Sequence, residues 1–150
     1  MLAVSMEVEV FFNGVSALTA EAWQAEITRL GFSVELDPGT NLESLSGFQP
    51  VTIDGERSGF ECYRRAVAAS PPRTWWRRRS SAGSGQTATP AGIEGDESVA
   101  FRWGGDLVEM AAALSAAAAL AVVTNGTLWD PQESRSYTPE EAVELARTAL

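Results

Sequence analysis

The chain has 150 residues, 45% of them hydrophobic, which is enough to bury the core of one domain without disulfides or metal. It contains no histidine and one cysteine, Cys62, which excludes Ser–His and Cys–His catalysis and an intrachain disulfide. The formal net charge is −9, with twenty acids against eleven basic residues, all arginine. This balance disfavours nucleic acid as a partner and favours a basic protein.

The charge is unevenly distributed along the chain. Residues 64–79 contain six arginines and no acid, so the remainder carries five arginines and twenty acids. The N-terminal sequence MLAVSMEVEV lacks the basic segment and the sustained apolar run of a secretory signal. We therefore predict a cytoplasmic protein, and we expect it to need no metal or cofactor.

The first predicted elements are a strand, a helix and a strand. Apolar and acidic residues alternate over positions 6–12, which is typical of a strand with one buried face. Thr19 is the predicted N-cap of an amphipathic helix that ends before Gly31. Alternation resumes at Phe32 and ends at the turn Asp37-Pro38-Gly39. Residues 4–37 thus predict a β-α-β unit whose two strands run parallel in one sheet.

A β-hairpin is predicted next. Two runs rich in Phe, Val and Ile flank Asp54-Gly55, a strong hairpin signal, between positions 47 and 63. Cys62 lies in the second run, with no histidine in the chain to activate it. We expect Cys62 to be a buried core thiol.

Residues 64–95 predict a long flexible loop. Pro71-Pro72 interrupts any helix, and residues 80–92 are rich in Ser, Gly, Thr and Pro. Trp75 and Trp76, together with Arg73 and arginines 77–79, can stack on bases and contact phosphates, but the acidic remainder of the chain disfavours nucleic-acid binding. A tolerated insertion and a shift of the coding frame are the two other interpretations of this segment.

The stretch 98–131 predicts the centre of the fold. A strand around Phe101 ends at Gly104-Gly105, and Asp106 has the position of an N-cap for a long apolar helix over 106–124. Asn125-Gly126 ends that helix before another short strand. The helix is long enough to span a membrane, but its capping acid, Glu109 and its many alanines disfavour a span.

Taken together, these elements predict a single α+β domain over residues 1–150. We expect a mixed, mostly antiparallel sheet of about five or six strands, with the helices at 19–30 and 106–124 packed on one face. A short C-terminal helix begins at Thr138-Pro139-Glu140-Glu141, which combines an N-cap, a first-turn proline and a capping-box glutamate.

Two candidate sites follow from this arrangement. Acidic residues that alternate with the apolar strand positions predict an acidic docking surface for a basic protein partner; they are Glu7, Glu9, Glu35 and Glu61. The alternative interpretation of these residues is an ordinary solvated sheet face. A pocket near Trp103, Asp106 and Trp129, for a small molecule or an enzymatic reaction, is the second candidate site. We assign no catalytic and no metal-binding residue.

Four segments of the chain, GFQPVTIDG, SGFEC, FRWGGDLVEMAAAL and GTLWDPQ, resemble a family of small bacterial α+β proteins with no assigned activity. The resemblance covers most of the chain except residues 64–95, and it implies a fold and little chemistry. In size, acidity and lack of catalytic residues the chain is also similar to toxin-neutralising immunity proteins. The favoured hypothesis is therefore a non-enzymatic acidic protein that binds a basic partner.

Overall fold

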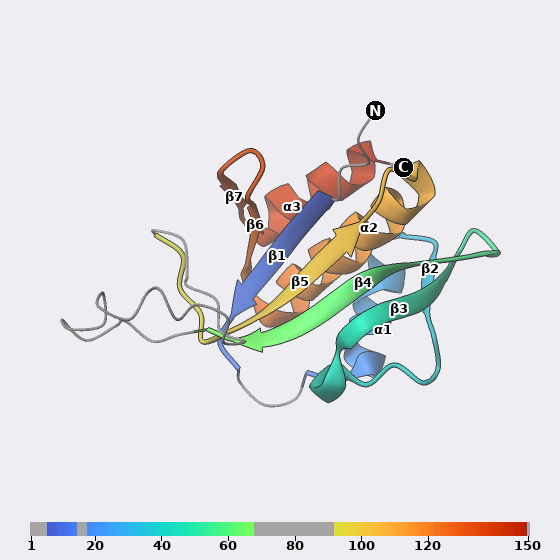
Figure 1. Ribbon diagram of the computed structural model, residues 1–150, viewed down its shortest axis with the longest axis horizontal. Coiled ribbons are helices and arrows are strands. Elements are labelled where there is room, and N and C mark those ends of the chain that lie inside the picture. The colour runs from blue at the N-terminus through green and yellow to red at the C-terminus, as the bar shows by residue number, and fades with distance from the viewer. Residues whose placement is uncertain (1–5, 15–17, 68–91, 150) are drawn as a thin grey trace.

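The computed structural model describes residues 6–14, 18–67 and 92–149, which form one sheet with helices on one side (Figure 1). The elements in chain order are β1 (Met6–Phe12), α1 (Ala20–Arg29), β2 (Val34–Leu36), the 3-10 turn η1 (Leu42–Ser44), β3 (Ser46–Ile53), β4 (Glu56–Ala66), β5 (Glu97–Trp103), α2 (Leu107–Thr124), β6 (Thr127–Asp130), β7 (Arg135–Tyr137) and α3 (Pro139–Thr148). The predicted α+β class is confirmed.

The sheet has seven strands in the order β2-β3-β4-β5-β1-β6-β7, and every neighbouring pair is antiparallel. β1 and β2 run in the same direction, as predicted, but β3, β4 and β5 lie between them. The sheet is therefore fully antiparallel, where a mixed and mostly antiparallel sheet was predicted. It has seven strands, one more than the predicted five or six. β7 is the additional strand: its three residues are too few to show an alternating pattern.

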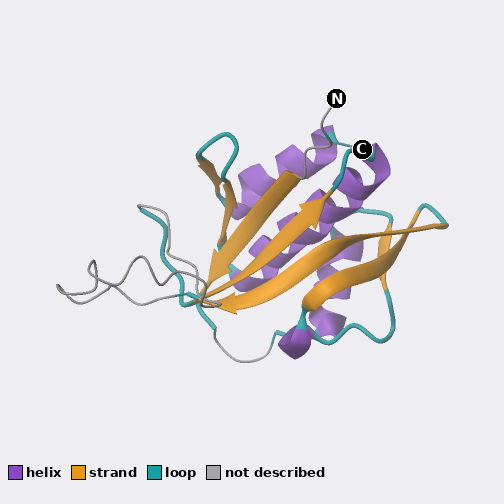
Figure 2. Cartoon of the chain, in the orientation of Figure 1, coloured by secondary structure: helices purple, strands orange, loops and turns teal. Residues whose placement is uncertain are grey.

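The helices α1, α2 and α3 all lie behind the sheet in the views of Figures 1 and 2. The central helix α2 contacts β1, β4, β5 and β6, with α1 and α3 packed on either side of it. Its length and its mean hydropathy of 2.0 would suit a membrane span, but Ala111–Ala121 is buried inside this protein. Burial against the sheet and its neighbouring helices accounts for this composition, because small alanines let the elements approach closely.

The core lies between the sheet and these helices. Phe101 on β5 is fully buried and packs edge-on against Trp23 of α1, with ring centroids 6.1 Å apart. It also meets Phe60 of β4, at 5.6 Å. The indole Nε1 of Trp23 donates a hydrogen bond of 2.9 Å to the Ala116 carbonyl, so the largest core side chain is also satisfied as a donor.

The local signals in the sequence are confirmed at the ends of the helices and at the hairpin. Thr19 and Asp106 accept hydrogen bonds from the backbone N–H groups of Ala22 and Val108, and Thr138 forms a complete capping box. Asn125 ends α2 in the left-handed conformation, at φ 53°. The turn between β3 and β4 has positive φ at both Asp54 and Gly55, which matches a type I′ hairpin.

The predicted boundaries of the loop at 64–95 need correction at both ends. Arg64 and Arg65 belong to β4, which runs to Ala66 and pairs with β5 as far as Glu97. At the other end, Ile93 is buried. Residues 68–91, with Trp75, Trp76 and the remaining arginines of the basic run, lie outside the described residues.

The outer edge of β2 is closed by a side chain from α1. Gln24 donates from Nε2 to the Val34 carbonyl at 3.0 Å and accepts from the Leu36 N–H at 2.6 Å. The amide thus forms the two hydrogen bonds that a further strand would make with these groups. Covering an edge in this way prevents it from pairing with another chain.

Candidate functional site

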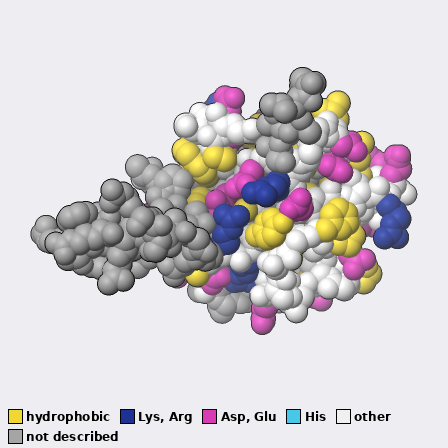
Figure 3. Space-filling model, in the orientation of Figure 1, with side chains coloured by type: hydrophobic (Ala, Val, Ile, Leu, Met, Phe, Trp, Pro, Cys, Tyr) yellow, Lys and Arg dark blue, Asp and Glu magenta, His cyan; other side chains and the backbone are white. Residues whose placement is uncertain are grey.

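The candidate site is the side of the sheet that faces away from the helices, which we call the open face. In the described part of the chain no helix covers it, and Figure 3 shows basic, acidic and apolar side chains side by side on it. Its strand positions alternate with the core residues and include Glu7, Glu9, Phe48, Glu61, Tyr63, Arg65, Ser98, Arg102 and Trp129.

One cross-strand row on this face combines an aromatic ring with three charges. The register aligns Phe48 with Glu61, Glu61 with Arg102, and Arg102 with Glu7, across four neighbouring strands. Arg102 pairs with Glu7 at 3.1 Å, while Glu61 accepts a hydrogen bond from the Tyr63 hydroxyl. This hydrogen bond raises the pKa of Tyr63, because it favours the protonated phenol. The charged side chains of this row are therefore already held by an ion pair or a hydrogen bond within the sheet.

Glu9 lies in the adjacent row and is buried, with only 5% of its surface exposed. Its cross-strand neighbours are Ala100 and Trp129, its carboxylate accepts a hydrogen bond from Ser98 Oγ, and Arg65 lies 4.0 Å away. Burial raises the pKa of Glu9, and the Ser98 hydrogen bond and the Arg65 charge only partly oppose that effect. Glu9 is thus a buried carboxylate that is hydrogen-bonded to Ser98 on this face, and it is not an exposed docking charge.

Phe48 is the exposed aromatic residue of the row, with 66% of its surface accessible. Its ring lies over Gly59 of β4, where an added Cβ would overlap Phe48 Cζ. The missing side chain at Gly59 therefore provides the place in which the ring rests. The ring of Phe48 therefore has a defined position on the open face although most of it is exposed.

A small apolar cluster borders the open face at one end. Phe11 and Val67 are buried together with Ile93, and Trp129 packs against them. Since Phe11 points away from the main core, this cluster is what removes its side chain from water. It also fixes residues 92–96 against the ends of β1 and β4, where Val67 N donates to the Asp96 carbonyl.

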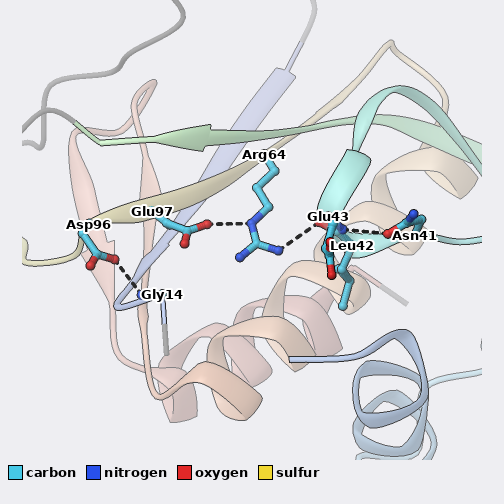
Figure 4. A network of polar contacts seen from close by, with 7 residues as sticks. All are labelled: Gly14, Asn41, Leu42, Glu43, Arg64, Asp96 and Glu97. Atoms are coloured by element: carbon cyan, nitrogen blue, oxygen red, sulfur yellow. Dashed lines mark hydrogen bonds and ion pairs between the residues drawn. The ribbon is translucent and has the colours of Figure 1, made fainter. Parts of the chain in front are cut away.

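Arg64 links the strands to the connection that precedes β3 (Figure 4). Its Nε donates to Glu97 at 2.7 Å, and a terminal nitrogen donates to the Leu42 carbonyl at 3.0 Å. The guanidinium also lies 5.8 Å from the centre of the Phe12 ring. Nearby, the carboxylate of Asp96 accepts from the Gly14 N–H. The arginine that the sequence placed in a loop therefore fixes η1 against the sheet.

The four predicted docking acids are placed differently. Glu7, Glu9 and Glu61 lie close together by register, whereas Glu35 is at the β2 edge of the same face, opposite Thr52 of β3. Arg65 and Arg102 lie among the first three, so this part of the face carries mixed charge and not a continuous acidic patch. Sequence alternation identified the acids, but it did not identify Phe48, Tyr63 or the two arginines as their neighbours.

The three residues of the predicted pocket are not brought together. Trp103 is buried in the main core, Asp106 caps α2, and Trp129 lies on the opposite face of the sheet with the apolar cluster. The alternation of strand side chains places the two tryptophans on different faces of the sheet.

The chemistry available to the described residues is limited. Burial raises the pKa of the Cys62 thiol, which keeps it protonated and poorly reactive. Ser98 donates to Glu9, but its side chain is fully buried. Within the described ranges there is no group of three or more side chains suited to hold a metal ion. The described residues of the open face thus present paired charges and an exposed aromatic ring.

Comparison of the chain with known protein families, with curated proteins and with solved structures finds no match. The resemblance to a family of small bacterial proteins accordingly stays a prediction.

Proposed function

We propose that this protein is a non-enzymatic binding protein that docks a basic protein partner on its open face. The observation that carries the proposal is the row Phe48, Glu61, Arg102 and Glu7, in which a held, exposed ring adjoins charges that have defined positions. Aromatic anchors surrounded by oriented charges are typical of protein interfaces. A toxin-neutralising immunity protein is the specific form of this function that we favour.

The charge of the protein supports a basic partner. The described residues include all twenty acids but only seven of the eleven arginines, and five of those seven arginines are in ion pairs with acids. The remaining carboxylates produce a negative field around the described fold. Such a field accelerates association with a positively charged protein and weakens with salt.

The ion pair between Arg102 and Glu7 on the open face contributes little to stability, which also supports a role in binding. Arg102 and Glu7 retain 42% and 24% of their side-chain exposure. An exposed ion pair of this kind stabilises a protein by about 0–1 kcal/mol. The same charges, once desolvated by a partner, select for partners that complement them.

The test is affinity capture from the native cell lysate at low and high salt, with the wild-type chain and two double variants. Glu7→Gln with Glu61→Gln removes two open-face charges, and Glu21→Gln with Glu140→Gln removes two exposed charges from the first turns of α1 and α3 as a matched control. We expect one basic protein to be retained at low salt, at least tenfold less by the open-face variant than by the control. Equal retention by both variants would contradict docking on the open face.

A further inference from the structure

A pocket of about 220 Å³ lies at the edge of the sheet beside Phe48. β2 pairs only with Val51–Ile53 of β3, so the outer edge of residues 46–50 faces the connection that runs from Asp37 to Leu45. The pocket lies between this edge and that connection and is open to solvent on one side. Its volume equals that of about seven water molecules, which is enough for the head group of one side chain.

Gln49 supplies an acceptor, Oε1, for which the described residues provide no donor. Its side chain is 94% buried, as 6% of its surface is exposed, and it lines the pocket. Nε2 donates to Thr40 Oγ1 at 2.6 Å and to the Pro50 carbonyl at 3.1 Å. Since the Pro50 carbonyl can only accept, the amide nitrogen must face it. No donor from the described residues reaches Oε1, which leaves the carbonyl of Gln49 to be satisfied from the pocket.

Asp37 adds a negative charge to the same lining. Its carboxylate accepts a hydrogen bond of 2.9 Å from the Gly39 N–H within its own turn. It makes no ion pair with any described arginine, and none of the described residues that line the pocket is basic. The pocket is therefore supplied with acceptors and with one uncompensated carboxylate.

The walls of the pocket are fixed before any ligand binds. Asp37 O accepts from Thr40 N at 2.9 Å, and Asn41 caps η1 through the Glu43 N–H at 2.9 Å. Arg64 holds the Leu42 carbonyl, as Figure 4 shows, and Phe48 rests over Gly59. Little conformational entropy is then lost on binding, which favours affinity at a small site.

We infer that this pocket binds the guanidinium group of an arginine side chain presented by the basic partner. The inference rests on the proposed docking function and specifies where the partner's main charged contact is made. A guanidinium has five N–H donors and no acceptor, which complements Gln49 Oε1 and the Asp37 carboxylate.

The inference is tested on the isolated full-length protein with a small probe. Nα-acetyl-arginine-N-methylamide is titrated into ¹⁵N-labelled protein, and the citrulline analogue serves as a neutral probe of nearly the same shape. We expect saturable shifts of the Gln49 side-chain amide and of the Gly39–Asn41 backbone amides, with the citrulline probe binding at least tenfold more weakly. Absence of binding by the arginine probe, or equal binding of both probes, would overturn the inference.

Two substitutions assign the binding to the pocket. Asp37→Asn keeps an oxygen to accept the Gly39 N–H but removes the charge, and it should weaken the arginine probe at least tenfold. Asp54→Asn removes an exposed carboxylate from another turn, at a left-handed position that Asn tolerates, and should leave binding unchanged. Equal affinities for the two variants would contradict the role of Asp37.

The probe titration and the lysate capture can fail independently. If the arginine probe does not bind while the open-face variant still loses its partner, the pocket is rejected and the docking face stands. If the probe binds in the pocket but neither open-face charges nor Asp37→Asn affect partner capture, the proposed docking function fails.

Discussion

The two faces of the sheet come from the same strands but differ in the interactions that their side chains make. The helix-covered face holds Phe101, Trp23 and the alanines of α2 in one continuous apolar core. The open face holds charges paired across strands, an internal carboxylate at Glu9 and an exposed ring at Phe48. The comparison teaches that apolar burial on the first face should supply most of the stability, whereas an exposed ion pair such as Arg102–Glu7 on the second contributes about 0–1 kcal/mol.

Two phenylalanine substitutions give the largest expected contrast between the faces. Phe101→Ala should lower the free energy of unfolding by about 3–5 kcal/mol, because it leaves a cavity among Trp23, Phe60 and α2. Phe48→Ala should change it by about 0.5 kcal/mol or less, since most of that ring is exposed. Urea denaturation of both variants measures the difference. Similar losses at the two positions would break the distinction between the faces.

A substitution of Arg64 tests how the connection before β3 is held against the sheet. Arg64→Gln removes the ion pair to Glu97 and the hydrogen bond to the Leu42 carbonyl. We expect a loss of about 1–3 kcal/mol, because both partners are partly buried and are left without their donor. Hydrogen exchange should also become faster at residues 41–45, which this side chain holds. Unchanged exchange there would show that Arg64 is not the fixing contact.

Ser115 is an exception to the apolar rule on the helix-covered face. It is fully buried in α2, and its hydroxyl has no hydrogen-bond partner among the described residues. Ser115→Ala should therefore stabilise the protein by about 1–2 kcal/mol, by removing an unsatisfied hydroxyl and adding a better helix former. A rise in the urea midpoint checks this expectation, and a fall would indicate that the hydroxyl is satisfied in solution.

Glu9 gives the smallest effect, and it depends on pH. Its folded-state pKa lies above the unfolded value because of burial, so between the two values the folded protein binds the proton more readily. The contribution of Glu9 is thus fully present below the unfolded pKa and is lost as pH rises through the folded pKa. From pH 4 to pH 7.5, wild type should lose stability relative to Glu9→Gln. A stability difference that does not change with pH would contradict this account.

The sequence predicted the local structure well because the signals for it are local. Thr19, Asp106 and Thr138 cap their helices through groups within three residues, and Asp54-Gly55 specifies its own turn. Alternation in β1 also assigned Val8, Val10 and Phe12 to the core. These features depend on neighbouring residues alone, so no knowledge of the tertiary fold is needed.

The features that sequence reasoning missed depend on contacts between distant segments. Arg64 and Arg65 looked like the start of a basic loop, but pairing with β5 extends β4 beyond them. Glu9 looked like a surface acid, although Ser98 and Trp129, both far along the chain, surround it. The polar pocket at Gln49 arises because β2 ends at Leu36 and leaves part of β3 unpaired. None of these pairings has a signature in the sequence alone.

Photo-crosslinking in native cells tests the central claim most directly, since it reports which face the partner touches. Phe48 is replaced by p-benzoylphenylalanine in one variant, and Leu107, an apolar residue at the start of α2 with 72% exposure, is replaced in a second. We predict that the variant at position 48 crosslinks to one basic protein and that the variant at position 107 does not. Crosslinking of that protein at position 107 only, or equally at both positions, would contradict docking on the open face.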